Sequence, residues 1–339
     1  MILDSRASAR ELAELGRLAE RFGVHGVWVS SLGDSRDPFA NLVLLAQATS
    51  QIRLGPVAVN PFDVHPARIA SALLTLNELA GGRARIVIGG GGEALQALGI
   101  EPRRRVRAVR ECVEILRAAA SGGEVDFAGE LYQVSGLRFR WLEAPPPGIL
   151  VGASQPQMLR MAARHADGIM MSDMPPVPAA AAIRTLNEAL LANAGTDLRC
   201  ASRPDFDTTV FTAWHVHEDR QLARHEARRW LYLRGIFRPW LLENFLSPDD
   251  VALVMGSQSA FAAAFAGGSS EVDGVPDRVL DALVDALTIC GSPDDLDPVL
   301  ARLHELKSTG LGGVALRLYA DPAAAICLIG SRIVPALAA

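Results

Sequence analysis

The chain has a single lysine, Lys307, so nearly all of its positive charge comes from arginine. A Schiff base with a carbonyl substrate needs a lysine amine, usually at the end of a barrel strand. Lys307 lies instead in a helical pattern of apolar and charged residues. We therefore do not expect Schiff-base chemistry.

Cysteine is also scarce, and its spacing excludes several kinds of site. The four cysteines, Cys112, Cys200, Cys290 and Cys327, are far apart in the sequence and form no CxxC pair. This spacing argues against a zinc knuckle, a redox pair and a secreted disulfide framework. A reduced, cytoplasmic environment is the expectation.

The sequence lacks blocks of like charge and long apolar runs. Its formal net charge is −5, with no run of five like charges, so we expect no nucleic-acid partner and no polybasic membrane anchor. The early charges Asp4 and Arg6 leave no apolar core for a signal peptide. The uncharged stretch 251–268 is interrupted by Gly-Ser-Gln-Ser, which predicts a buried helix pair or a lid rather than a membrane span.

What the sequence does contain is a repeated alternation of apolar strands and amphipathic helices. Half of the 339 residues are apolar, so a large buried core is expected. Strands are predicted near residues 27, 52, 86, 149, 169, 208 and 314, and Met1-Ile2-Leu3 fits the tail of an eighth. Eight strands in βα repeats favour a TIM (β/α)₈ barrel with a truncated first strand over an open doubly wound sheet. We predict one domain, 1–339, with insertions near 120–148 and 234–292.

The strongest local motif is a glycine loop, Gly89-Gly90-Gly91-Gly92-Glu93-Ala94, directly after a predicted strand. Without Cβ atoms, this backbone can approach a flat or anionic ligand closely. The motif nearly fits G-x-G-x-x-A, but a dinucleotide site also needs an acidic residue about 20 positions later, where an arginine-rich helix is predicted instead. A cofactor loop and a simple tight turn both remain open. Glu93 could move a proton or simply favour a helix N-terminus.

Two further patterns have both a functional and an ordinary explanation. Pro56 lies inside a predicted strand that runs to Asn60-Pro61, which indicates either a bulge or a strand that begins after the proline. His215 and His217 lie two apart in a predicted strand, so both could face a metal in a barrel hydrolase. We expect no metal site, because in barrel hydrolases such a pair is usually joined by a lysine or further histidines and a late aspartate, and here Lys307 is misplaced.

Several ordered motifs together resemble a known family. They are residues 23–29, residues 49–61 with His65-Pro66, Gly81-Gly82-Arg83 with the glycine loop, residues 152–156 with Ala166-Asp167-Gly168, and Leu316-Arg317-Leu318-Tyr319. This set is similar to the bacterial luciferase-like oxidoreductases. Within them it resembles the branch that uses the deazaflavin coenzyme F420, which includes methylenetetrahydromethanopterin reductase.

The resemblance implies an F420-dependent oxidoreductase that transfers a hydride at C5 of the deazaflavin to or from a small organic substrate. It also implies a TIM barrel with an insertion, a homodimer, and a coenzyme bound at the C-terminal strand ends. The alternatives are an FMN-dependent luciferase-like monooxygenase and, from another class, a non-catalytic coenzyme-binding protein. The implied cofactor-binding residues are Val57, Ala58, Asn60, Gly91, Gly92, Glu93, Gly152, Ala153, Ser154 and Gln155.

The resemblance also implies particular roles for some of these residues. Val57 and Ala58 fall on a bulge with a non-proline cis peptide, and Glu93 falls on the carboxylate that some members use as a catalytic proton donor. Residues 153–155 fall where the family contacts the ring or its phosphate-bearing tail.

The chain departs from the family pattern at two places that bear on the substrate. Ser31 and Leu32, predicted to line the substrate pocket, stand where members often have Asp-His. Leu32 cannot transfer a proton, so acid–base chemistry falls to Glu93 or to the substrate itself. The lysines that bind sugar phosphate in F420-dependent glucose-6-phosphate dehydrogenase have no counterpart, so a sugar-phosphate substrate is disfavoured.

Overall fold

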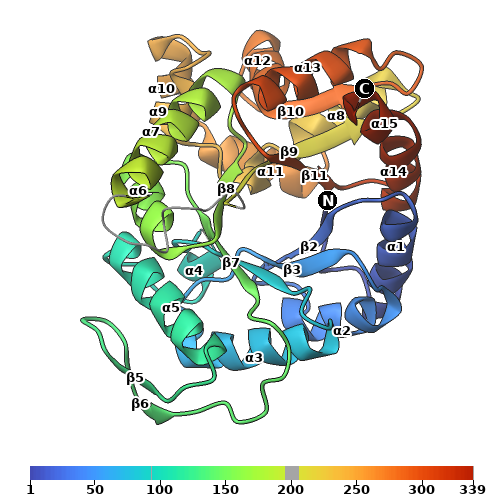
Figure 1. Cartoon of the computed structure of the whole chain (residues 1–339). Helices are drawn as coiled ribbons and strands as arrows, with labels where there is room; N and C mark the ends of the chain where they lie inside the picture. Colours follow the sequence, from blue (N-terminus) through green and yellow to red (C-terminus); the bar gives the residue numbers. More distant parts are fainter. Residues whose placement is uncertain (93, 195–205, 339) are drawn as a thin grey trace.

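The computed structural model describes residues 1–92, 94–194 and 206–338, and in these ranges parallel strands form a barrel surrounded by helices (Figure 1). The barrel strands are β1 (Ile2–Leu3), β2 (Gly26–Ser30), β3 (Arg53–Val57), β4 (Arg85–Ile88), β7 (Gly148–Gly152), β8 (Gly168–Ser172), β9 (Asp207–Val216) and β11 (Gly313–Leu318). The predicted (β/α)₈ barrel is confirmed. The first strand is short, as expected, and it pairs with both β2 and β11.

Helices follow the barrel strands and cover their outer faces. They are α1 (Ala9–Arg21), α2 (Pro38–Ala48), α3 (Pro66–Leu79), α4 (Ala94–Ala97), α5 (Arg105–Ala120), α6 (Pro156–His165), α7 (Pro176–Ala194), α8 (Arg220–Arg229), α13 (Asp297–Ser308), α14 (Pro322–Leu328) and α15 (Val334–Ala338), with a π-helical turn at Ile329–Ile333. The first helix shows why the sequence folds this way. Ser8 and Glu11 form a reciprocal capping box, which satisfies backbone N–H groups at the helix start. Its buried face, which includes Leu12 and Ala19, packs on α2.

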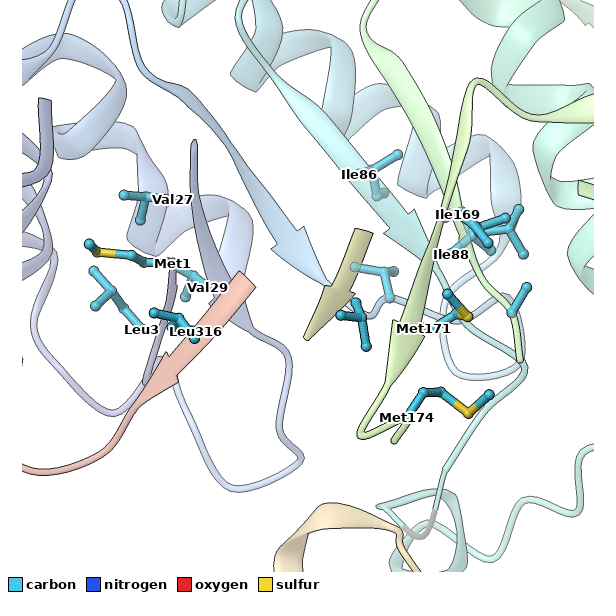
Figure 2. Packing of buried hydrophobic residues seen from close by; sticks show 14 of the residues in the cluster. Met1, Leu3, Val27, Val29, Ile86, Ile88, Ile169, Met171, Met174 and Leu316 are labelled. Carbon is cyan, nitrogen blue, oxygen red and sulfur yellow. The ribbon is translucent and has the colours of Figure 1, made fainter. Parts of the chain in front are cut away.

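The barrel interior is a small apolar cluster separate from the main core. It consists of Ile2, Trp28, Val57, Val87, Leu150, Met170, Phe211 and Ala315, one residue from each of the eight barrel strands. The neighbouring positions on these strands face the helices instead, because side chains alternate along a strand. Figure 2 shows this outer layer, in which Val27, Val29, Ile86 and Ile88 belong to the main core.

The predicted insertion at 120–148 contains a β-hairpin outside the barrel, with strands β5 (Val125–Ala128) and β6 (Gln133–Leu137) (Figure 1). Glu111, fully buried on α5, holds the turn of the hairpin. Its carboxylate accepts hydrogen bonds from the backbone N–H groups of Glu130, Leu131 and Tyr132 at 2.9–3.1 Å. The Tyr132 hydroxyl then donates to the carbonyl of Pro61 at 2.8 Å. The hairpin is therefore fastened to the loop that follows β3.

The predicted insertion at 234–292 is mostly helical. It contains the end of a 3₁₀ turn (Tyr232–Arg234), α9 (Pro239–Leu242), α10 (Pro248–Gly256), α11 (Gln258–Gly267) and α12 (Asp277–Leu287), and it ends in β10 (Thr288–Gly291). This last strand pairs with the final residues of β9. The uncharged stretch 251–268 forms most of α10 and all of α11, so the predicted pair of helices is present. Only Val251, Val254 and Phe261 of this stretch are buried, so the pair is less buried than expected. Across the described ranges, no helix is long and apolar enough to cross a membrane.

Candidate active site

The carboxyl ends of the barrel are lined by the side chains that come after the interior cluster on each strand. Two positions beyond a cluster member, the same face carries Ser30, Gly89, Gly152, Ser172, Ala213 and Arg317. Two positions further on lie His215, in β9, and Tyr319, directly after β11. The rim therefore has one side of bare backbone, on β3, β4 and β7, and one side of large polar and aromatic groups, on β9 and β11.

The bare side begins with an extra residue in β3. Isolated bridges pair Leu54 with Ala84 and Val59 with Ile88. Between these two bridges the chain through β3 advances five residues, whereas the chain through β4 advances four. Of the two alternatives for Pro56, the structure shows the bulge, and the peptide bond between Val57 and Ala58 is cis, at the position that the family resemblance implied. The Val57 carbonyl accepts a hydrogen bond of 2.8 Å from the backbone N–H of Ser31. This bond ties the start of the β2 loop to the bulge.

Glycine is required where β3 meets β4. A Cβ at Gly55 would fall 2.7 Å from the carbonyl carbon of Arg85 and closer still to its oxygen, so the two backbones could not approach as they do.

Three of the predicted coenzyme segments meet on this bare side. A Cβ at Gly89 would lie 3.1 Å from the Cβ of Ala58, and a Cβ at Gly152 would lie 3.6 Å from the Cα of Gly89. Gly91 has φ +78°, and a Cβ there would lie 2.5 Å from Leu95. The bulge, the glycine loop and the end of β7 thus form a continuous surface of backbone and one methyl group. A flat conjugated ring fits such a surface, because no side chain holds it away.

The other predicted cofactor residues are placed less directly. Asn60 builds a turn, since its Oδ1 accepts from the backbone N–H groups of Phe62 at 3.0 Å and Asp63 at 3.3 Å. Ala153 is buried and its N–H donates to the Met170 carbonyl. Ser154 is half-buried, and Gln155 is the exposed N-cap of α6 with no capping side-chain bond.

The remaining predicted site residues lie in the loops that follow β2 and β4. Gly92 is exposed, and Ser31 and Leu32 are half-buried. The Leu32 carbonyl accepts from the Ser35 hydroxyl at 2.9 Å. Glu93, the predicted catalytic residue, lies outside the described residues.

The opposite side of the rim is an aromatic stack, whose residues were not predicted to belong to the coenzyme or substrate site. The His215 and Tyr319 rings are 5.0 Å apart and only 7° from parallel, and Trp230 packs on Tyr319 at 4.4 Å. The Arg317 guanidinium lies 5.1 Å from the Tyr319 ring centre. Their signal in the sequence was the even spacing of four residues from Phe211 to His215 and from Ala315 to Tyr319, which becomes informative once the barrel interior is known.

His215 is held as a neutral imidazole. Burial, and then the positive charge of Arg234, lower its pKa to about 3. Its Nε2 is buried without a hydrogen-bond partner among the described residues, and so is the Tyr319 hydroxyl. Two buried polar atoms without partners on one wall of a strand-end site suit a ligand that can pair with them.

The His215–His217 pair does not form a metal site in this structure. His217 is exposed, and its Nδ1 accepts from the backbone N–H of Asp219 at 3.0 Å, whereas His215 is buried against Tyr319. No group of three or more potential metal ligands occurs in the ranges that the structure describes.

A buried ion pair fastens the second insertion to the strand ends beside this wall. The Asp173 and Arg234 side chains are each 1% exposed, and Arg234 Nε donates to Asp173 Oδ1 at 3.1 Å. Arg234 Nη2 also donates to Asp173 and to the Leu287 carbonyl. Asp173 directly follows β8, so the pair fixes the insertion next to His215.

Comparisons with known proteins agree with this architecture. A profile of the family described as luciferase-like monooxygenase matches residues 2–312. The chain is 34% identical to the 5,10-methylenetetrahydromethanopterin reductase of Archaeoglobus fulgidus, over 96% of each chain. It is 27% identical to the F420-dependent glucose-6-phosphate dehydrogenase of Amycolatopsis mediterranei, over 48% of this chain and 53% of that protein.

The fold is shared with solved structures at low identity. The coenzyme F420-dependent tetrahydromethanopterin reductase from Methanopyrus kandleri superposes with a TM-score of 0.76 at 23% identity, covering 99% of this chain and 97% of that one. An F420-dependent secondary alcohol dehydrogenase superposes with a TM-score of 0.75 at 18% identity, covering 99% and 98%. Because the family profile matches residues 2–312 and the Archaeoglobus fulgidus relative is 34% identical over 96% of each chain, the chain is an enzyme that belongs to the luciferase-like monooxygenase family.

Proposed function

We propose that this protein is a coenzyme F420-dependent oxidoreductase that transfers a hydride between the deazaflavin and an organic substrate. The observation that carries the proposal is the meeting of Ala58, Gly89 and Gly152, which leaves a wall of bare backbone at the carboxyl ends of β3, β4 and β7. The 34% identity to an archaeal 5,10-methylenetetrahydromethanopterin reductase over nearly the whole chain supports it. When bound, the coenzyme supplies a hydride at C5 of its ring.

The residues on the bare side would bind and orient the coenzyme. Ala58, Gly89 and Gly152 would contact the flat face of the ring. Ser154 and Gln155 precede α6, a helix of 10 residues whose first N–H groups receive no side-chain cap from Gln155. Backbone N–H groups at a helix start favour an anion, so this end of α6 suits the coenzyme phosphate. Position and electrostatics are then the protein's contribution to the redox step.

The residues on the aromatic side would face the substrate. Tyr319 and His215 present a flat apolar surface with two polar atoms that need partners. A neutral imidazole has one N–H donor and one acceptor nitrogen, so His215 can orient a polar substrate group without adding charge. Ser31 and Leu32 would line the pocket beside β2. Leu32 has no proton to give, so the acid–base role would fall to Glu93 or to the substrate itself.

The catalytic role of Glu93 is tested by a substitution that removes its titratable carboxyl group and keeps the shape of the side chain. Glu93→Gln should lower turnover at least roughly tenfold, in line with the loss of general acid–base catalysis, while the coenzyme affinity changes little. Glu101→Gln is the matched control, because Glu101 is an exposed carboxylate nearby that pairs with Arg103 at 2.8 Å. Wild-type turnover in Glu93→Gln would remove Glu93 from the mechanism.

The choice of coenzyme is tested by titration. The protein is mixed with F420 and, separately, with FMN, and binding is followed by absorption and fluorescence. We expect tight binding of F420 and reduction or oxidation of its ring once a substrate is present. Tight binding of FMN with none of F420 would overturn the proposal in favour of an FMN-dependent monooxygenase, the candidate favoured by the family description. Binding without any turnover across substrate classes would favour a non-catalytic coenzyme carrier.

The assembly and location of the enzyme are part of the same proposal. We expect a homodimer in the cytoplasm, which light scattering on the purified protein and cell fractionation would test. A strictly monomeric protein that is fully active would contradict the first of these.

A further inference from the structure

A second charged feature lies outside the barrel and has no place in the function proposed above. A cavity of about 800 Å³ runs between the start of α5 and the length of α6, which lie side by side on one flank of the barrel (Figure 1). Six arginines line it: Arg104, Arg105, Arg107, Arg110, Arg160 and Arg164. Among the described residues that line it, none is acidic. We call it the arginine groove.

Only part of this positive charge is neutralised by neighbours. Glu130, from the turn of the hairpin insertion, pairs with Arg104 and Arg107. Within the described ranges, Arg105 and Arg160 have no ion-pair partner, and Arg164 donates to the Asn193 amide oxygen at 3.5 Å rather than to a carboxylate. Like charges gathered in one cavity repel each other, so the groove favours an oligoanion.

The two helices that form the groove add to its positive potential. Arg105 and Arg107 lie in the first turn of α5, and Arg104 at its N-cap provides no side-chain hydrogen bond. Cations at a helix N-terminus are unfavourable, because they lie at the positive end of the helix dipole. Neither α5 nor α6 has an acidic residue in its first turn. A bound anion would supply the missing negative charge at both helix starts.

The groove opens at the loops assigned to the coenzyme. A Cβ at Gly90 would lie 3.6 Å from the Cβ and Cδ of Arg105 and 3.7 Å from the Cε of Met158. On the other wall, Gln157 lies two residues after Gln155, the N-cap of α6. A ligand whose ring lies at the strand ends and whose tail leaves between β4 and β7 therefore enters the groove.

We propose that the arginine groove binds the acidic tail of the coenzyme, the γ-linked glutamates that follow the phosphate of F420. Their carboxylates would pair with Arg160 and Arg164 on α6, beyond the phosphate at the helix start. The ten residues of α6 span ~15 Å, enough for several glutamates. The volume lies within the range of small-ligand sites, and the net charge of −5 does not favour a nucleic acid. This inference rests on the proposed function.

The test compares coenzymes that differ only in the tail. Dissociation constants are measured by fluorescence for the deazaflavin riboside without phosphate or glutamate, for F420 with one glutamate, and for F420 with a long tail. The protein is wild type, Arg160→Gln/Arg164→Gln, and the control Arg10→Gln/Arg17→Gln, which removes two exposed arginines from α1 on another flank. Thermal unfolding of each variant checks that it is folded.

We expect wild type and the α1 control to bind the long-tailed coenzyme more tightly than the short-tailed one, with an advantage that falls as salt rises. Arg160→Gln/Arg164→Gln should lose roughly 3- to 30-fold in affinity for the long tail, as two partly exposed ion pairs contribute, and bind the riboside like wild type. Equal affinity for short and long tails in wild type would overturn the inference while the coenzyme assignment stands. Failure of every deazaflavin to bind would overturn the proposed function, and the inference with it.

Discussion

The buried imidazole of His215 leads to a prediction about stability in acid. Burial and the charge of Arg234 lower its pKa from 6.5 to about 3, so the folded protein does not take up a proton that the unfolded chain binds below about pH 6.5. Because the folded-state pKa is depressed, the stabilising contribution is present above the unfolded pKa and is lost as the pH falls toward 3. Protonation of His215 thus favours unfolding throughout that window.

The size of the effect follows from the shift. At about pH 4.5 the unfolded histidine lies two units below its pKa, and each unit is worth about 1.4 kcal/mol, so His215 should account for roughly 3 kcal/mol of lost stability relative to pH 7.5. His215→Phe removes the titrating group and keeps a flat ring against Tyr319. It also removes Nε2, which has no partner among the described residues, so stability near neutral pH should change little.

The measurement is urea unfolding of wild type and variants at about pH 7.5 and pH 4.5. The free energy lost between the two pH values should be smaller in His215→Phe by roughly 3 kcal/mol. His215→Asn, which also lacks the titrating ring, should show the same reduced acid dependence even if it is less stable overall. His217→Gln controls for removing a histidine from this strand end and should behave like wild type. An unchanged acid dependence in both His215 variants would refute a neutral, buried imidazole.

Three other features give simpler predictions. Asp173→Asn leaves the charge of Arg234 buried without its partner, so the free energy of unfolding at neutral pH should fall by about 3–5 kcal/mol, and a loss under 1 kcal/mol would contradict the buried pair. Gly55→Ala puts a Cβ against the β4 backbone and should lower the midpoint of urea unfolding by the equivalent of about 1–3 kcal/mol or prevent folding, whereas wild-type stability would mean that β3 and β4 can separate. Burial raises the pKa of the Cys112 thiol, so native protein should be alkylated at exposed Cys327 and not at Cys112, as peptide mass spectrometry would show; rapid labelling of Cys112 would indicate an opened core.

The barrel could be predicted from the sequence because its signals are local. Apolar strands and amphipathic helices alternate from one end of the chain to the other, and Pro56 marked the bulge in β3. The strand β10 was missed, because Thr288 follows α12 with no intervening turn residue and its partner is the overhang of β9 beyond β8. Pairing of this kind depends on where another strand ends, which no local pattern contains.

The start of α5 was predicted less accurately, because it too depends on a contact that is distant in the sequence. An arginine-rich helix was predicted after the glycine loop, but α5 begins only at Arg105, so Arg103 and Arg104 precede it. Arg104 has φ 52° and pairs with Glu130, which belongs to the hairpin insertion. The start of this helix is therefore tied to a contact that is distant in the sequence, and helix propensity alone could not place it.

One part of the candidate site could likewise be predicted from local sequence patterns, and the other part could not. The glycine loop and the bulge were visible because glycine and proline mark unusual backbone wherever they occur. The wall of His215, Tyr319 and Trp230 was not, because it is assembled from three separate parts of the chain, and each residue alone is typical of an ordinary core.

The two walls of the candidate site differ in how far substitutions can change them. The bare wall consists of backbone and the Ala58 methyl group, so any side chain at Gly89 or Gly152 would add atoms to the surface that we propose for the coenzyme. The opposite wall consists of side chains on β9 and β11 and of two that directly follow β11 and α8. Under the proposed function, substitutions on the second wall would change the substrate while the surface for the coenzyme stays the same. That fits a chain whose relatives include both a 5,10-methylenetetrahydromethanopterin reductase and a glucose-6-phosphate dehydrogenase. The specificity of this enzyme should therefore be sought in His215, Arg317 and Tyr319 rather than in the glycine loop.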